Sequence, residues 1–145
     1  MLIRVLSRSN IERLLEKGLP NNTAIVSFSD TEDDFIEFPA GTDVLQIAFY
    51  DVRPHTVAKE HYDKILPEAK QIAEYVYQKK LEGKDLICQC DYGISRSAGL
   101  AAAVLQRWGK KGIEVFADYR YTPNQFVYNK VFKELEQLGN KEEKL

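Results

Sequence analysis

A nucleophile and a phosphate-binding cation stand close together in residues 90–97, which include Cys90, Gly93, Arg96 and Ser97. A cysteine thiolate is a strong nucleophile, and a guanidinium stays charged and holds two phosphate oxygens at once. Glycine gives the backbone freedom where a loop turns tightly. The stretch therefore has the residue types needed to bind a tetrahedral oxyanion and to attack it.

The segments on either side predict a strand, then this loop, then a helix. Residues 85–89 are a short apolar run, typical of a buried strand, and residues 97–108 are apolar on nearly every side, as in a buried helix. Such a loop can turn its N–H groups inward, and the helix N-terminus adds its own N–H groups and its dipole. We expect a phosphate cradle with the Cys90 thiolate at its base, placed for in-line attack on phosphorus.

The simpler interpretation makes Cys90 a buried core cysteine and Arg96 a surface side chain. It leaves Gly93, Ser97 and the strand–loop–helix context without an explanation. We therefore favour the oxyanion-binding interpretation.

The rest of the chain predicts three further strands and four further helical segments. The strands are expected at residues 2–6, 23–28 and 44–50. The first helix has Ser9 as N-cap and Glu12 as its capping-box partner, and Gly18 ends it. A long helical region runs from about Ile65 to Gly83, with Pro67 kinking it or starting a new helix.

Two more helices follow the loop. Residues 112–121 predict a short irregular helix, and Asn124 is a plausible N-cap for a last helix that Gly139 ends. Strands that alternate with helices predict an α/β fold with a central, mostly parallel sheet of four to five strands flanked by helices. Ligands gather at the carboxyl ends of such strands, where both Asp51 and Cys90 stand.

The composition is that of a globular domain. The 145 residues predict one domain over 1–145, with 140–145 as a frayed tail. A net charge of -2 predicts no general attraction to nucleic acid or membrane. No apolar run could span a bilayer, and the N-terminus does not resemble a secretory signal. With two cysteines and no disulfide framework, we expect a cytoplasmic monomer.

The spacing Cys90-x5-Arg96 followed by Ser97 resembles the signature of the protein tyrosine phosphatase superfamily, and residues 93–97 look most like its small dual-specificity branch. Tyr50-Asp51 resembles the general-acid loop of that branch, and residues 120–126 resemble the segment after its signature helix. The resemblance extends from about residue 44 to 135. Low-molecular-weight phosphatases and arsenate reductases carry the signature near the N-terminus instead.

The resemblance implies a role for each matching residue. Cys90 is the nucleophile, Arg96 binds two phosphate oxygens, and Ser97 donates to the thiolate. Asp51 protonates the leaving oxygen and then activates water. Asn124 hydrogen-bonds to the phosphate-binding loop and holds its shape. The remaining phosphate oxygens are bound by the N–H groups of Asp91, Tyr92, Gly93, Ile94, Ser95 and Arg96, and no metal or cofactor is needed.

Two residues depart from the pattern of that branch. Gln89 stands where these phosphatases usually have a histidine that supports the loop network. Asp91 places a carboxylate beside the thiolate; we expect its side chain to point outward, to the rim, where it would repel polyanions and tolerate basic substrates.

Other residues have competing interpretations. Asp43 and Asp33 compete with Asp51 as the acid, and Asp51 could be a turn residue. The acidic run 30–34 predicts a solvated loop, with metal binding as the alternative.

We expect Cys88 to be a core residue, although a strained disulfide with Cys90 is possible. Zinc is not expected, because Cys88, Cys90, His55 and His61 lack the paired spacing of its sites. The two histidines are expected on the surface, and Arg53 and Tyr92 at the rim of the site.

The sequence predicts a cysteine-dependent phosphomonoester hydrolase of the protein tyrosine or dual-specificity type, acting on phosphorylated protein. Three alternatives remain open at this point. They are a module that binds phosphorylated residues without turnover, a phosphatase for RNA 5′ ends or small phosphates, and a sulfurtransferase-like enzyme.

Overall fold

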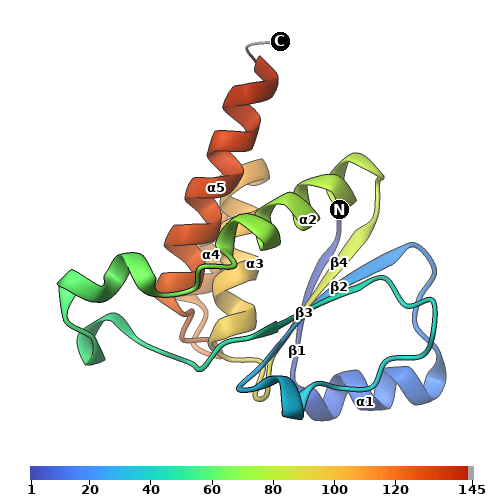
Figure 1. Ribbon diagram of the computed structural model, residues 1–145. Helices are drawn as coiled ribbons and strands as arrows, with labels where there is room; N and C mark the ends of the chain where they lie inside the picture. The colour runs from blue at the N-terminus through green and yellow to red at the C-terminus, as the bar shows by residue number, and fades with distance from the viewer. Residues whose placement is uncertain (144–145) are drawn as a thin grey trace.

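The computed structural model describes residues 1–143 and contains one parallel sheet with the strand order β1-β4-β2-β3 (Figure 1). All three strand pairs are parallel. The central position of β4 places the residue that follows it, Cys90, between the ends of β1 and β2. The strands are β1 (Ile3–Leu6), β2 (Thr23–Ser29), β3 (Val44–Ala48) and β4 (Asp85–Gln89).

Helices cover both faces of this sheet, which confirms the predicted α/β layers (Figure 1). One helix lies on one face, and the others pack on the opposite face or against one another. The α-helices are α1 (Arg8–Lys17), α2 (Ala69–Leu81), α3 (Arg96–Gly109), α4 (Gly112–Ala117) and α5 (Gln125–Glu143). The 3₁₀ segments are η1 (Glu32–Asp34), η2 (Pro54–Thr56) and η3 (Lys59–Lys64).

The core has two unequal halves, because alternate residues of a strand face opposite sides of the sheet. Ile25 and Ile87 pack with Ile11 of α1 in the smaller half. Val26 and Cys88 point to the larger half, which α2, α3 and α5 cover. Helix α3 is buried over most of its length, as its nearly continuous apolar sequence predicts.

Helix α1 begins earlier than its sequence predicts. Ser7, and not Ser9, is the N-cap, and its Oγ accepts a hydrogen bond from the N–H of Asn10 at 3.2 Å. The N–H of Arg8 donates to the carbonyl of Asp91 at 3.0 Å. This long-range bond ties the chain just after β1 to the phosphate-binding loop, and a local capping pattern does not reveal it.

The long helical region predicted from about Ile65 is shorter than expected. Helix α2 starts at Ala69, and the preceding Leu66 has a φ of 52°. A residue before proline is disfavoured in the α conformation, so Pro67 separates η3 from α2. Strand β3 also ends early, at Ala48, opposite Ser29 at the end of β2.

Gly139 does not end the last helix, because α5 continues to Glu143. A Cβ on Gly139 would lie 2.0 Å from Nη2 of Arg107 on α3, so glycine allows close contact between the two helices. Residues 140–143 thus belong to α5, and residues 144–145 lie outside the described part, so the frayed tail stays a prediction.

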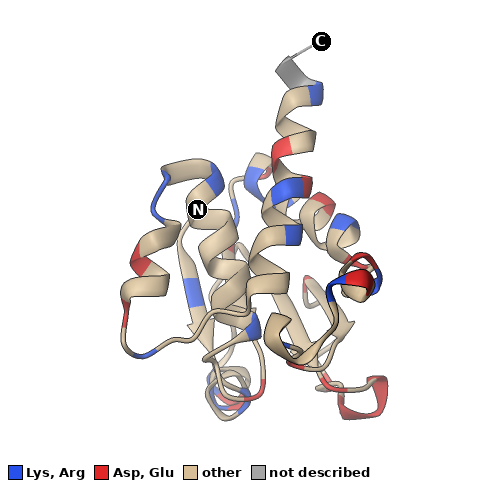
Figure 2. Ribbon diagram, turned by 90° about the vertical axis from the view of Figure 1, so that its left-hand side faces the viewer, with Lys and Arg blue, Asp and Glu red and all other residues tan. Residues whose placement is uncertain are grey.

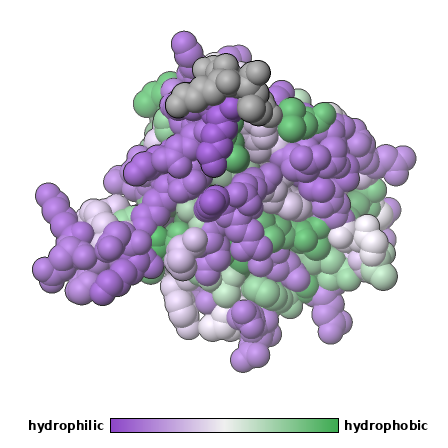
Figure 3. All heavy atoms as spheres, turned by 45° about the horizontal axis from the view of Figure 1, so that its top comes forward, coloured by the Kyte–Doolittle hydropathy of each residue, from purple (hydrophilic) through white to green (hydrophobic). Residues whose placement is uncertain are grey.

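The face of the molecule in Figure 3 is mostly hydrophilic, and hydrophobic side chains lie in separate groups on it. Among residues 1–143, no helix has the length and apolar character needed to cross a membrane.

Candidate active site

The carboxyl ends of the four parallel strands bring the candidate residues to one edge of the sheet. Arg8 comes shortly after β1, Asp30 directly after β2, Asp51 shortly after β3 and Cys90 directly after β4. Because these residues follow different strands, only the sheet order decides which of them meet.

Cys90 is 2% exposed and lies against the start of α3. Its Sγ is 3.0 Å from Oγ of Ser97, and the N–H of Ser97 points to the same sulfur at 3.5 Å. The predicted pairing of Cys90 with Ser97 is therefore present in the structure.

Gly93 fits a position of the loop that no larger residue would tolerate. Its φ is 67°, and a Cβ there would lie 2.8 Å from the nitrogen of Ser7 and 2.9 Å from the carbonyl carbon of Leu6. The loop thus packs directly on the end of β1. The carbonyl of Leu6 accepts a hydrogen bond from the N–H of Cys90 at 3.3 Å, which fixes the same contact.

Arg96 is buried, at 4% exposed, and its guanidinium is held by three oxygen acceptors. Nη1 donates to Oδ1 of Asp30 at 2.8 Å and to the carbonyl of Phe49 at 2.6 Å, while Nη2 lies 3.4 Å from Oδ2 of Asp91. Sequence reasoning missed Asp30 as a partner of Arg96. Its place at the carboxyl end of β2 was the available signal, but the order of the strands was needed to use it.

The sequence predicts that the Asp91 side chain points outward to the rim. In the structure its carboxylate instead contacts two arginines. One of its oxygens is 3.4 Å from Arg96 and the other is 3.9 Å from Nη1 of Arg8. The carboxylate, which is 29% exposed, lies between two arginines from different elements, an arrangement that a sequence read without tertiary contacts cannot reveal. Asp91 therefore faces two arginines rather than standing alone beside the thiolate.

Asp51 faces the same pocket as Cys90. Its Oδ1 accepts hydrogen bonds from Oγ of Ser95 at 2.6 Å and from Nδ2 of Asn124 at 2.7 Å. Its Oδ2 lies 3.5 Å from Arg53, and the side chain is 33% exposed. A carboxyl group that is fixed in position and still reached by solvent can exchange a proton with a bound molecule.

These side chains enclose a pocket of about 200 Å³. Cys90 and Arg96 belong to its lining, and Tyr92, which is 81% exposed, stands at the rim, as the sequence predicts. The lining residues are Asp51, Arg53, Cys90, Tyr92, Ile94, Ser95 and Arg96.

Asn124 hydrogen-bonds to the phosphate-binding loop, as predicted, and also connects it to the loop that carries Asp51. Its backbone N–H, not its side chain, donates to the phosphate-binding loop, at the carbonyl of Ser95 (2.9 Å). The side-chain amide donates instead to Asp51 and to the carbonyl of Val52, at 2.7 and 2.9 Å. Its Oδ1 accepts from the N–H of Val127 at 3.1 Å, so Asn124 is also the predicted N-cap of α5.

Gln89 and Cys88 are both fully buried on β4. The Gln89 Nε2 donates to the carbonyl of Cys90 at 3.0 Å, and its Oε1 accepts from Oγ of Ser27. Cys88 packs in the larger half of the core, as predicted. Burial raises the pKa of the Cys88 thiol, and the neighbouring Cys90 raises it further, so Cys88 stays protonated.

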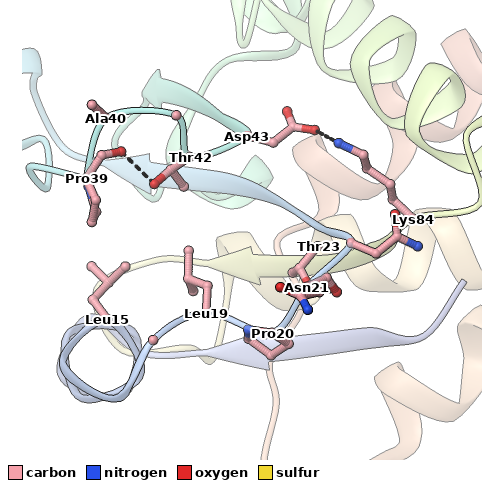
Figure 4. Close-up of a pocket in the computed structure, with 13 residues that line it drawn as sticks. Leu15, Leu19, Pro20, Asn21, Thr23, Pro39, Ala40, Thr42, Asp43 and Lys84 are labelled. Carbon is pink, nitrogen blue, oxygen red and sulfur yellow. Dashed lines mark hydrogen bonds and ion pairs between the residues drawn. The ribbon is translucent and has the colours of Figure 1, made fainter.

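Asp43 lies far from Cys90 in the sheet, at the amino end of β3. It pairs with Lys84, as Figure 4 shows. It also pairs with Lys79 and accepts a hydrogen bond from Tyr75. Burial alone would raise the pKa of Asp43, but the hydrogen bonds from Lys79, Lys84 and Tyr75 outweigh it and lower the pKa to about 2. Asp43 is therefore a structural anion beside a second, larger pocket, and not the acid of the site.

Only residues 32–34 of the acidic run form the exposed segment η1, where acidic residues are grouped (Figure 2), whereas Asp30 binds Arg96. The link of η1 to the loop passes through Arg8, which donates to the carbonyl of Asp34 at 2.7 Å. Within the described residues, no group of three or more histidine, cysteine or acidic side chains could hold a metal ion. His55 and His61 are exposed, as predicted.

No family model matches the chain, and no curated protein matches its sequence. Solved structures do match it. The match to the crystal structure of DUSP15 covers 96% of this chain and 91% of the DUSP15 chain, with 17% sequence identity and a TM-score of 0.61. PTPMT1, solved in complex with PI(5)P, covers 97% and 94%, with 16% identity and a TM-score of 0.58.

A third match is the PTP-2 phosphatase of Cydia pomonella, which covers 86% of this chain and 78% of its own, with 20% identity and a TM-score of 0.57. At these identities the likeness shows the fold alone. The chain has the α/β fold of the dual-specificity branch of the protein tyrosine phosphatases, as its sequence predicts.

Proposed function

We propose, from this dual-specificity phosphatase fold and the geometry of its pocket, that the chain hydrolyses phosphomonoesters through a phosphocysteine intermediate. The observation that carries the proposal is the convergence of three groups on one pocket of about 200 Å³: Cys90, Arg96 and Asp51. They are a nucleophile, a phosphate-binding cation and a proton donor, which are the groups that this reaction needs.

In the first step the thiolate of Cys90 attacks phosphorus, the S–P bond forms and the P–O bond to the leaving group breaks. Asp51 gives its proton to the leaving oxygen. Arg96 and the inward N–H groups of the loop bind the other phosphate oxygens, whose charge is spread in the transition state. To bind them, Arg96 exchanges part of its contact with Asp30 and Asp91 for the phosphate.

In the second step Asp51, now ionised, takes a proton from water. The water oxygen forms a bond to phosphorus, and the S–P bond breaks to release the thiolate and inorganic phosphate. The Ser97 hydroxyl, 3.0 Å from the sulfur, stabilises the departing thiolate by a hydrogen bond. Each step balances without any other reactant.

The charges around the pocket favour a phosphorylated protein as the substrate. Asp30 and Asp91 flank Arg96, and the other cation of the lining, Arg53, is paired with Asp51. A substrate with several phosphates, such as an RNA 5′ end, would meet these carboxylates, and like charges repel. A single phosphate on a side chain carries less negative charge into the site.

The test is hydrolysis of an aryl phosphate by wild type, Cys90→Ser and Asp51→Asn. We expect turnover by wild type, none by Cys90→Ser and about a hundredfold less by Asp51→Asn, which is the usual scale of general acid–base catalysis. Trapping of ³²P on the protein of wild type but not of Cys90→Ser would identify the intermediate. Turnover that survives in Cys90→Ser would refute the mechanism, and binding of phosphate without turnover would favour a binding module.

A further inference from the structure

Two buried polar side chains, Ser27 and Gln89, lie directly beneath the phosphate-binding loop. They face each other in the register of β2 and β4, and both are 0% exposed. Ser27 Oγ donates to Oε1 of Gln89, and Nε2 of Gln89 donates to the carbonyl of Cys90 at 3.0 Å. The amide of Gln89 is thus held at one end and holds the nucleophile's own carbonyl at the other.

The bond to the Cys90 carbonyl also sets the direction of the next N–H group. The C=O and N–H of a trans peptide point in opposite directions, and every described peptide bond is trans. Because the Cys90 carbonyl points to Gln89, the N–H of Asp91 points away from Gln89. That N–H is the first of the donors that would bind phosphate.

We propose that Ser27 and Gln89 are positioning residues that fix the Cys90–Asp91 peptide and so preset the first N–H of the phosphate cradle. This inference rests on the proposed function. The Ser27–Gln89 pair carries no charge, because neither a serine hydroxyl nor a glutamine amide titrates in the usual pH range. Its hydrogen bond to Cys90 is therefore made at every pH at which the protein is folded.

A general need to satisfy buried serines does not explain this pair. Ser29, two residues along on the same face of β2, is also 0% exposed, and its Oγ has no hydrogen-bond partner. It is the one such buried side-chain oxygen or nitrogen in the described part of the chain. The fold thus tolerates a buried hydroxyl without a partner here, whereas Ser27 contacts the residue that holds the nucleophile.

The test compares Ser27→Ala with Ser29→Ala, which removes an equally buried hydroxyl from the same strand. Phosphate affinity is measured as protection of Cys90 from iodoacetamide by inorganic phosphate, with the labelled peptide identified by mass spectrometry. We expect Ser27→Ala to weaken phosphate binding and to lower kcat/KM for an aryl phosphate by about three- to tenfold, because the Gln89 amide loses its support. Ser29→Ala should leave both unchanged, and Ser27→Thr, which restores the hydroxyl, should recover them.

Gln89→Leu provides a second variant that removes the donor to Cys90 itself, with a larger expected loss of phosphate affinity. If Gln89→Leu does not fold, the test rests on Ser27→Ala. Its melting temperature is compared with that of Ser29→Ala to separate an effect on phosphate binding from an effect on stability. The positioning role would be overturned by equal phosphate affinity in wild type, Ser27→Ala and Ser29→Ala. If wild type still turned over the aryl phosphate, the proposed function would remain intact. No protection and no turnover in wild type would overturn both.

Discussion

Arg96 meets two carboxylates before any phosphate reaches it. Asp30 lies 2.8 Å from Nη1 and Asp91 lies 3.4 Å from Nη2. These anions keep the buried guanidinium paired, which avoids the cost of an isolated buried charge. They also oppose an incoming anion, so they must lower the affinity of the pocket for phosphate.

Asp91→Asn should therefore bind inorganic phosphate more tightly. The substitution keeps the shape of the side chain and removes one negative charge close to the oxyanion site. We expect the inhibition constant of phosphate to fall by about three- to tenfold, on the scale of one charge pair at the surface of a protein. It is measured as product inhibition of aryl phosphate hydrolysis.

Asp33→Asn, on the exposed segment η1, is the matched control and should change that constant much less. Unchanged or weaker inhibition of Asp91→Asn by phosphate would contradict the view that Asp91 competes for Arg96.

At the scale of elements, Asn124 joins the start of α5 to both loops of the site. It caps α5, holds Asp51 and Val52 through its side chain, and holds Ser95 through its backbone. The acid loop and the phosphate-binding loop are thus positioned by one buried residue, which is 1% exposed.

Asn124→Ala should lower stability and also impair the acid step. Loss of the cap costs about 1 kcal/mol, measurable by urea unfolding. Without its amide donor Asp51 is less well placed, so kcat should fall more for alkyl phosphates, whose leaving groups need a proton, than for aryl phosphates. Asn129→Ala, on the exposed side of the same helix, is the control. An equal loss for both substrates would mean that Asn124 has only a structural role.

The cluster around Asp43 links β3 to Tyr75 and Lys79 of α2 and to Lys84 in the turn before β4, the last of which Figure 4 shows. Against the effect of burial, the hydrogen bonds from Lys79, Lys84 and Tyr75 lower the pKa of Asp43 to about 2 in the folded protein, from its ordinary value of 3.8. A carboxyl group with a lowered folded-state pKa stabilises the protein above its unfolded-state pKa. The contribution is lost as the pH falls from about 4 through 2.

Asp43→Asn should accordingly lose about 2 kcal/mol of unfolding free energy at pH 7, the value of this shift at 1.36 kcal/mol per pKa unit. The difference in unfolding free energy between variant and wild type should fall towards zero between pH 4 and pH 2. Urea unfolding at each pH measures it. Glu136→Gln, at an exposed position of α5, is the control. A difference that stays constant down to pH 2 would show that the ion pairs are not its source.

At the scale of the molecule, acidic side chains are grouped around the arginine that would bind phosphate. The formal net charge is only -2, but Asp30 and Asp91 both contact Arg96 of the pocket lining, and the acidic segment η1 follows Asp30 closely in the chain. Such a field attracts cationic partners and repels anionic ones over about one Debye length.

Phosphopeptides flanked by lysine and arginine should therefore be better substrates than the same peptides flanked by aspartate and glutamate. We expect kcat/KM to differ by about tenfold at low salt and the difference to shrink at 0.5 M salt, because screening weakens exposed charges. A phosphoinositide in micelles serves as the polyanionic comparison. Preference for it over the basic peptide would contradict the substrate class proposed above.

The sequence by itself determined the parts that depend on local pattern. The apolar runs and their spacing predict the parallel α/β sheet and its covering helices, and the residue types at 90–97 predict the loop. The family resemblance of that loop implies its cysteine–serine contact. Strand periodicity and turn chemistry depend on only a few neighbouring residues, so they can be recognised in the sequence without knowledge of the fold.

Only the tertiary structure decided which distant residues meet. The order β1-β4-β2-β3 brings Asp30 to Arg96 and Ser27 to Gln89, and it turns Asp91 inward to Arg8. It also ties Asn124 to Asp51 and removes Asp43 from the site. The physical reason is that these contacts join residues far apart in the chain, and strand order and register, which fix them, are not encoded in any short stretch.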